Sequence, residues 1–146
     1  MSERIPMSRE GYEKLKTELD RMQNVEMIEV AKRIAAAREL VASFGGVCVL
    51  KGSGTLVASL YDGMVTVCDR GNPGMASGGM GDVLTGTIAG LRAQGLSTLD
   101  AARLGVWVHA AAGDDAAQAG EAGTLASDLF PFLRARLNRL VRHAER

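Results

Sequence analysis

A glycine-rich stretch that leads into a helical pattern is the feature that most constrains how this chain can fold. Residues 71–86 read G-N-P-G-M-A-S-G-G-M-G-D-V-L-T-G, with six glycines in sixteen positions. Glycine has no Cβ, so such a loop lets backbone N–H groups come close to a ligand. A helix that begins directly behind the loop adds unpaired N–H donors and the positive end of its dipole. This combination is typical of an anion site, and phosphate is the anion that fits it best.

Asp82 is the single carboxylate in this stretch, and it stands where the glycines give way to the helical pattern. A carboxylate at the mouth of a phosphate site can exchange a proton with a group held beside the phosphate. The alternative is a flexible glycine loop whose Asp82 only caps the helix, because short glycine motifs also occur by chance. Spacing alone leaves both interpretations open.

The length and charge of the chain restrict its class. A chain of 146 residues makes one domain, or one small domain with an appendage. Seventeen basic and seventeen acidic residues cancel, so bulk charge does not indicate a nucleic-acid partner. No apolar stretch is long enough to span a bilayer, and the first residues, M-S-E-R-I-P, do not form a signal peptide. We therefore expect a cytoplasmic protein without a nucleic-acid or membrane partner.

The two cysteines, Cys48 and Cys68, both lie in short apolar runs. Buried, reduced thiols are the favoured interpretation, and a disulfide is the less favoured one. His109 and His143 are too few and too far apart in the sequence to indicate a metal site. We therefore expect no metal held by the protein itself.

The composition changes sharply between residues 31 and 45. Residues 1–40 hold sixteen charged residues, eight of each sign, and one glycine. Residues 41–146 hold eighteen charged residues and the other seventeen glycines. This change predicts two segments of different origin, a charged helical segment over 1–40 and a second domain over 41–146.

The first segment has the pattern of a long amphipathic helix. Ser8 can cap its start, and an apolar stripe at spacings of three and four begins with Tyr12. The stripe changes phase near Asn24, where we expect a break or a kink. The stripe positions before the change are Tyr12, Leu15, Leu19 and Met22, and those after it are Met27, Val30, Ile34, Ala37 and Val41. A narrow apolar stripe on a charged helix needs a packing partner, so a coiled-coil-like role is expected.

The second segment predicts an α/β fold with an α+β layered arrangement. Short apolar runs at 47–50, 55–60 and 64–68 read as strands, and Tyr61-Asp62-Gly63 reads as the turn of a hairpin between the last two. Three helices are then expected: from Asp82 to about Ala93, from the cap Ser97 to about Gln118, and after Ser127. The result is a small three-stranded sheet packed by about three helices. Its edge strands would be exposed.

Several ordered motifs of the second segment resemble the C-terminal part of the ADP-dependent NAD(P)H-hydrate dehydratases. The resemblance runs from about Ala36 to Leu140. It rests on V-L-K-G-S-G-T at 49–55, the glycine loop at 71–86, A-Q-G-L at 93–96, A-A-R-L-G-V-W-V-H at 101–109, A-G-D at 112–114 and L-A-S-D-L at 125–129. The family has a ribokinase-like fold, so the resemblance implies a partial ribokinase-like fold and a nucleotide-binding domain over 41–146.

The resemblance also implies a reaction and the residues that perform it. Such enzymes use ADP to dehydrate the S form of hydrated NADH or NADPH, which yields the intact cofactor, AMP and phosphate. ADP, with or without Mg²⁺, is the implied cofactor, and Asp82 matches the general base beside the hydroxyl of the hydrated nicotinamide. The implied nucleotide contacts are Lys51, Gly52, Ser53, Gly54, Thr55 and Gly81. The implied anion hole is Gly78, Gly79, Met80 and Gly81.

The first segment resembles the N-terminal helical arm of a Gre-type transcript-cleavage factor. The similar residues are R-I-P-M-S-R-E-G-Y-E-K-L-K-T-E-L-D at 4–20, N-V-E at 24–26 and A-A-A-R-E at 35–39. The chain departs from that family directly after Glu39, with no acidic tip, returning helix or polymerase-binding domain. We therefore expect neither transcript cleavage nor binding to RNA polymerase, and the chain looks like a chimera of two families.

Two functions follow from these resemblances. The first is a dehydratase fragment that keeps the nucleotide-phosphate half of the site, with weak or no turnover because the rest of the family domain is needed to orient the acceptor. The alternative is a non-enzymatic folded chimera in which the Gre-like helix serves packing or oligomerisation. The exposed sheet edges and the narrow helical stripe both favour a homo-oligomer.

Overall fold

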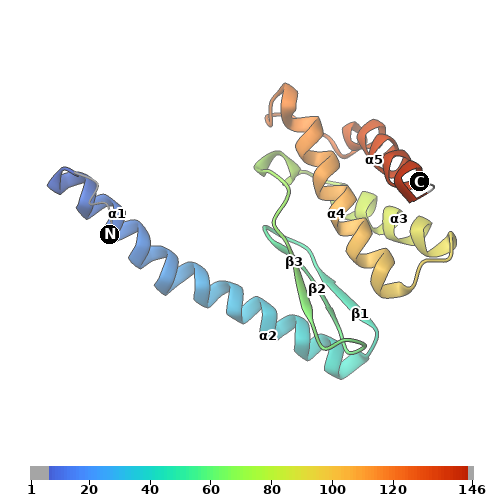
Figure 1. The fold of residues 1–146 in the computed structure, drawn as a ribbon, viewed down its shortest axis with the longest axis horizontal. Coiled ribbons are helices and arrows are strands. Elements are labelled where there is room, and N and C mark those ends of the chain that lie inside the picture. The colour runs from blue at the N-terminus through green and yellow to red at the C-terminus, as the bar shows by residue number, and fades with distance from the viewer. Residues whose placement is uncertain (1–6, 145–146) are drawn as a thin grey trace. The chain divides into compact units, whose positions relative to one another are not determined.

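The first helix begins where the sequence predicts it. A computed structural model of the protein describes residues 7–144, with side chains up to Val141, and Figure 1 shows its elements. Helix α1 spans Arg9–Arg21 and follows Ser8, whose hydroxyl accepts a hydrogen bond from the Gly11 N–H at 3.1 Å. This N-cap satisfies one of the unpaired donors of the first turn.

A π-helical turn lies where the apolar stripe changes phase. Residues Met22–Glu26 are π-helical and lead directly into helix α2, Met27–Phe44, and the Met27 N–H donates to the Met22 carbonyl. A π-helical turn contains more residues than an α-helical turn, so it rotates the following side chains relative to the preceding ones. The expected break near Asn24 is thus a change of helical geometry within a continuous helix.

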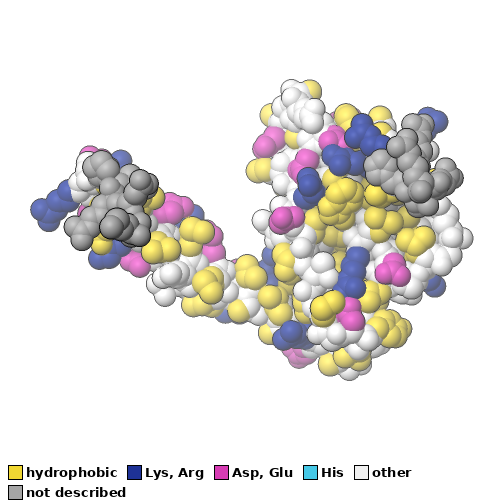
Figure 2. Space-filling view, viewed as in Figure 1, with side chains coloured by type: hydrophobic (Ala, Val, Ile, Leu, Met, Phe, Trp, Pro, Cys, Tyr) yellow, Lys and Arg dark blue, Asp and Glu magenta, His cyan; other side chains and the backbone are white. Residues whose placement is uncertain are grey.

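Contacts within the chain divide it into two units, 1–36 and 37–146, and the division falls inside α2. In the first unit the apolar stripe is exposed, and hydrophobic side chains are visible along this segment in Figure 2. The side chains of Tyr12, Leu15, Leu19 and Met22 are between 48% and 57% exposed. In the second unit Ala37 and Val41 are buried. The different origin predicted for residues 1–40 stays a prediction.

Three antiparallel strands form the sheet in the order β1-β2-β3, and they comprise Val47–Leu50, Thr55–Ser59 and Val65–Cys68. Val57 of the central strand pairs with Val49 on one side and with Thr66 on the other. The predicted hairpin is confirmed, and Gly63 in its turn has a φ of 66°, which glycine adopts without strain. Both hairpin strands are one residue shorter at the turn than predicted.

Three α-helices follow the sheet. Helix α3 spans Met80–Ala93, α4 spans Thr98–Ala116 and α5 spans Leu129–Ala144. Ser97 caps α4 as predicted, because its hydroxyl accepts the Asp100 N–H at 3.1 Å. Short 3-10 helices lie within the glycine-rich loop at Pro73–Met75, after α4 at Ala117–Ala119 and before α5 at Ala126–Asp128. The last helix therefore starts at Leu129, after a 3-10 turn that contains Ser127.

Helices α3 and α4 form the middle layer of the second unit, with the sheet on one side and α5 on the other (Figure 1). One buried cluster joins the sheet to these helices through Val57, Leu84 and Val106. A second cluster joins them to α5 through Val108 and Leu129. Both faces of α4 are therefore buried, and its many small residues permit this. A Cβ on Gly105, for example, would lie 2.6 Å from Cγ1 of Ile88 on α3.

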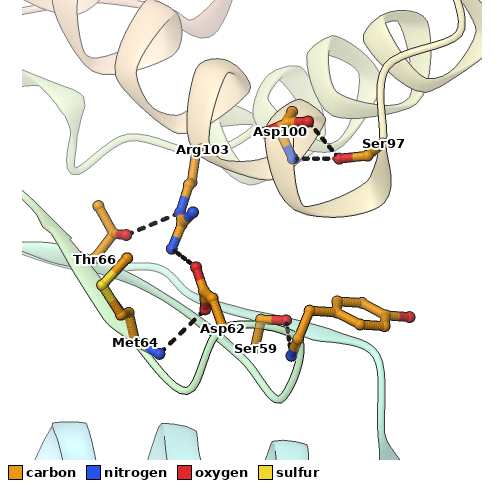
Figure 3. Close-up of polar contacts among 8 residues, drawn as sticks. Ser59, Asp62, Met64, Thr66, Ser97, Asp100 and Arg103 are labelled. Carbon is orange, nitrogen blue, oxygen red and sulfur yellow. Dashed lines mark hydrogen bonds and ion pairs between the residues drawn. The ribbon is translucent and has the colours of Figure 1, made fainter.

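A polar contact ties the hairpin to the middle layer. Figure 3 shows the guanidinium of Arg103, on α4, donating to the Thr66 hydroxyl at 3.0 Å and to the Asp62 carboxylate at 2.6 Å. The Met64 N–H also donates to Asp62. These two donors lower the pKa of the Asp62 carboxyl, with the Met64 N–H making the larger contribution. Arg103 thus fixes the direction of the hairpin relative to α4.

Both cysteines are free thiols, as predicted. Cys68 is buried in the cluster between sheet and helices. Cys48 is half-buried, and this burial raises the pKa of its thiol.

Candidate functional site

A cavity of about 470 Å³ lies at the edge of the sheet where β1 and β3 end and β2 begins. The loop before β2 and the first half of the glycine-rich loop form its polar walls, and α3 and α4 supply its apolar wall. The lining residues are Lys51–Thr55, residues 69–73, Met75, Ala76, Leu84, Val106, His109 and Ala110. This concave site lies entirely within the second unit.

The first wall contains five of the six nucleotide contacts that the family resemblance implies, all except Gly81. Lys51, Gly52, Ser53, Gly54 and Thr55 all line the cavity. The loop is closed by two short-range hydrogen bonds, since Gly52 N–H donates to the Thr55 hydroxyl at 3.3 Å and that hydroxyl donates to Gly52 O at 3.0 Å. The loop between β1 and β2 therefore places all five residues in one wall of the cavity.

The predicted anion hole and base lie directly before α3 and on its first turn, outside the lining of the cavity. Gly79 is the N-cap with a φ of 83°, and Val83 N–H donates to its carbonyl at 3.0 Å. Asp82 is exposed, and within residues 7–144 its carboxylate forms no hydrogen bond. It therefore does not act as the helix cap, which was one of the two interpretations left open by the sequence.

The glycines around this turn differ in whether packing within the chain requires them. A Cβ on Gly79 would lie 3.2 Å from the Ala126 Cβ, and its positive φ also disfavours other residues. A Cβ on Gly78 or Gly81 would meet nothing within 4 Å. Packing within the chain therefore explains Gly79 and leaves open space above Gly78 and Gly81.

Asp114 holds the glycine-rich loop against α4, a role that the sequence did not indicate. Its carboxylate accepts the Gly71 N–H at 3.1 Å and the Asn72 side-chain amide at 3.2 Å. The A-G-D motif at 112–114 contains this residue, but its partners lie more than forty positions away in the sequence. Asp114 therefore positions the loop that forms the second wall of the cavity.

Two guanidinium groups lie over the ring of Trp107. The Cζ atoms of Arg70 and Arg136 are 5.5 Å and 5.7 Å from its ring centroid, within the range of cation–π contacts. Arg136 also forms a bidentate pair with Asp115, with both N–O distances 2.7 Å. This pairing lowers the pKa of the Asp115 carboxyl.

His109 is buried in the wall of the cavity, with 3% of its surface exposed. Burial lowers the pKa of its imidazole, a hydrogen bond with the backbone of Met80 opposes this effect, and the charge of Lys51 adds to it. The ring is therefore neutral at pH 7. The contact with Met80 links the cavity wall to the first turn of α3, where the predicted anion hole lies.

The described residues supply no ready-made metal site. Over residues 7–144, no group of three or more His, Cys, Asp or Glu side chains is placed to hold an ion. A Mg²⁺ ion here would depend on nucleotide phosphates for most of its ligands, as is usual for this metal. No helix in the described part of the chain is long and apolar enough to cross a membrane.

Comparison with known proteins establishes the family to which the chain belongs. The profile of the NAD(P)H-hydrate dehydratase family matches residues 15–134, which include the cavity and the whole glycine-rich loop. The chain belongs to the NAD(P)H-hydrate dehydratase family. The same relationship appears in individual relatives and in solved structures.

Two enzymes and one crystal structure illustrate this similarity. The bifunctional NAD(P)H-hydrate repair enzyme of Vibrio cholerae is 54% identical over 123 residues, which cover 83% of this chain and 24% of that enzyme. The ADP-dependent (S)-NAD(P)H-hydrate dehydratase of Neisseria meningitidis is 44% identical over 77% of this chain and 38% of its own length. The Bacillus subtilis ADP/ATP-dependent dehydratase, co-crystallised with ATP/Mg²⁺, matches with a TM-score of 0.68 at 31% identity, over 84% of this chain and 46% of that one.

The chain therefore spans about a quarter of the Vibrio enzyme and less than half of the Bacillus chain. The prediction of a partial dehydratase fold is confirmed by the structural match. The family match begins at residue 15, inside the segment that resembles a Gre-type factor. None of these findings supports that second resemblance.

Proposed function

We propose that this chain forms the nucleotide-phosphate part of an ADP-dependent NAD(P)H-hydrate dehydratase site. One observation carries the proposal: Lys51–Thr55, which match the nucleotide contacts of the family, line one cavity together with the glycine-rich loop. The cavity volume of about 470 Å³ is in the range of small-molecule sites. The positive charge of Lys51 suits the phosphates of ADP.

The first turn of α3 would hold the phosphate that is transferred. Gly78, Gly79, Met80 and Gly81 precede or open this helix, so their N–H groups lie at the positive end of its dipole. The open space above Gly78 and Gly81 supports a close approach by a ligand. Because His109 connects Met80 to the cavity wall, a nucleotide in the cavity would extend its terminal phosphate towards this turn.

Asp82 would serve as the general base. Its exposed carboxylate is free of hydrogen bonds within the described residues, so it can accept the proton of the ring hydroxyl of hydrated NADH or NADPH. The hydroxyl oxygen then attacks the β-phosphorus of ADP, and AMP leaves. Breakage of the C–O bond, with loss of a proton from the neighbouring ring carbon, releases phosphate and restores the nicotinamide double bond.

We expect these 146 residues to turn over hydrated NADH weakly or not at all. The matched region corresponds to less than half of the Bacillus dehydratase. Phosphoryl transfer requires the acceptor hydroxyl to be held in line with the phosphate, and loss of that orientation removes much of the rate acceleration. Nucleotide binding and turnover are therefore expected to separate in this chain.

Calorimetric titration with ADP tests the proposal directly. The wild-type chain should bind ADP, and Lys51→Ala should weaken binding about tenfold by removing a charged contact to phosphate. Lys32→Ala, which removes the same charge from α2, should leave the affinity unchanged. Asp82→Asn should keep ADP binding. It should abolish any formation of NADH from its hydrate, which is measured by the absorbance of NADH. Absence of any heat with ADP would exclude the proposal.

We also propose that the chain forms a homo-oligomer through its N-terminal helical segment. The support is the exposed stripe of Tyr12, Leu15, Leu19 and Met22, because half-exposed apolar side chains in a row gain free energy when another surface covers them. A second copy of the helix offers the same stripe in the same spacing. This proposal requires no RNA polymerase partner.

A further inference from the structure

Arg70 and Lys51 lie at the same edge of the sheet. Strands β1 and β3 both run antiparallel to β2, so they run parallel to each other and their carboxyl ends meet at one edge. Lys51 follows β1 directly, Arg70 follows β3 by two residues, and both line the cavity. The two strand ends are two strand spacings apart, about 10 Å.

The guanidinium of Arg70 lies over an aromatic ring, and its charge also acts on the Asp115 carboxylate, whose pKa it helps to lower. Its Cζ lies 5.5 Å from the centroid of Trp107, and among residues 7–144 Arg70 forms no ion pair. The second guanidinium on this ring, that of Arg136, is different because its charge is paired with Asp115. Stacking on an aromatic face restrains the planar fork and leaves its N–H donors available.

The charges of the cavity wall favour an anionic ligand. Lys51 and Arg70 supply two cations, and Asp69 supplies the only carboxylate among the lining residues. His109 adds no charge at pH 7, because burial lowers the pKa of its ring. The lining residues therefore carry a net charge of +1, which favours an anion, and a diphosphate would contact both cations at once.

We propose that Arg70 is a second phosphate-binding cation, which works with Lys51 across the width of the sheet edge and makes the site prefer a nucleoside diphosphate over a monophosphate. This inference rests on the proposed nucleotide-binding function. Arg70 binds the ligand, and Trp107 positions the Arg70 guanidinium.

Binding of adenosine, AMP and ADP to the full chain tests this inference by calorimetry. Arg70→Ala should weaken ADP binding about tenfold, weaken AMP binding less, and leave adenosine unchanged, because each charged hydrogen bond to phosphate contributes to affinity. Arg70→Lys should give an intermediate affinity, since lysine keeps the charge but lacks the fork. Arg139→Ala is the matched control, and it should change none of the three affinities.

The fluorescence of Trp107, the only tryptophan, gives a second readout. Binding of ADP should change the emission of the wild-type chain as the guanidinium on its ring engages phosphate, and this change should be absent in Arg70→Ala. If Lys51→Ala weakens ADP binding but Arg70→Ala does not, the role of Arg70 is excluded and the proposed function stands. An equal loss of affinity for adenosine, AMP and ADP in Arg70→Ala would also exclude the phosphate-binding role of Arg70. If the wild-type chain binds no ADP, both proposals fail.

Discussion

Gly81 is a glycine that the fold of this chain does not require. It lies in the first turn of α3 with helical backbone geometry, and a Cβ there would enter open space. Glycine in a helix costs up to about 1 kcal/mol relative to alanine. A residue that lowers helix stability without a packing reason points to a ligand that approaches the backbone closely.

Gly81→Ala should therefore separate stability from binding. We expect the free energy of unfolding to rise by up to about 1 kcal/mol, while the affinity for ADP falls because the methyl group occupies the space of the phosphate. Thermal unfolding and calorimetric titration measure the two effects. Gly90→Ala is the control, since Gly90 is an exposed α3 residue with equally open space, and it should raise stability without changing the affinity.

His109 gives the fold a pH dependence whose sign follows from its environment. Burial holds the pKa of its ring below the ordinary value of 6.5. As the pH falls, His109 is therefore protonated at a higher pH in the unfolded chain than in the folded chain. The free energy of unfolding should therefore decrease as the pH falls below about 6.5. Urea unfolding between pH 8 and pH 5 should show this decrease in the wild-type chain.

Substitution identifies the histidine that is responsible. His109→Gln should flatten the pH dependence between those limits, and His143→Gln should leave it as in the wild-type chain. An unchanged slope in His109→Gln would mean that other groups cause it. Below pH 4 a further loss is expected, because the pKa values of the Asp62 and Asp115 carboxyls are lowered in the folded chain.

Among the elements, the N-terminal helix has an apolar stripe that the described residues of its own chain do not cover. The stripe of Tyr12, Leu15, Leu19 and Met22 has the periodicity of a packed helix face, yet these side chains are about half exposed. The π-helical turn at Met22–Glu26 then changes the phase of the stripe. A second apolar surface would bury these side chains.

Leu19→Lys should weaken self-association. The two residues have similar helix propensities, so the helix is kept while a charge replaces the centre of the stripe. We expect the wild-type chain to be larger than a monomer in light scattering coupled to size-exclusion chromatography, and the variant to be shifted to the monomer. Thr17→Lys, which lies away from the stripe, should not change the mass of the assembly measured in solution. A wild-type monomer at high concentration would exclude an oligomer formed through this helix.

For the whole molecule, the core lies in one of the two units. Both buried clusters consist of residues from Val47 onwards, and the unit that contains them begins at residue 37. Residues 1–30 contribute no buried side chain among those described. The stability of the second unit therefore comes from its own packing.

Deletion of residues 1–30 should preserve cooperative unfolding and ADP binding. The clusters between sheet and helices remain intact in the shortened chain, so its thermal unfolding should stay a single transition. Calorimetry of unfolding and of ADP titration provides the measurements. Loss of the cooperative transition would instead favour the alternative in which the N-terminal helix replaces missing elements of the domain.

The elements of this chain could be predicted because their signals are local. Ser8 and Ser97 cap helices by bonds to residues three positions away. The Tyr61-Asp62-Gly63 turn joins neighbouring strands. The ends of the helices were less predictable, as the 3-10 turn before Leu129 shows. There, hydrogen bonds of two helical types compete at similar energy.

The site was predictable in part. The glycine loop, the helix behind it and the family motif at Lys51–Thr55 could be predicted, because each is a contiguous run with its own backbone requirement. The shared cavity of Lys51 and Arg70 and the contact of Asp114 with the glycine loop depend on the tertiary fold. These partners come from different elements, and their distance depends on strand register and helix packing. Local periodicity carries no information about either.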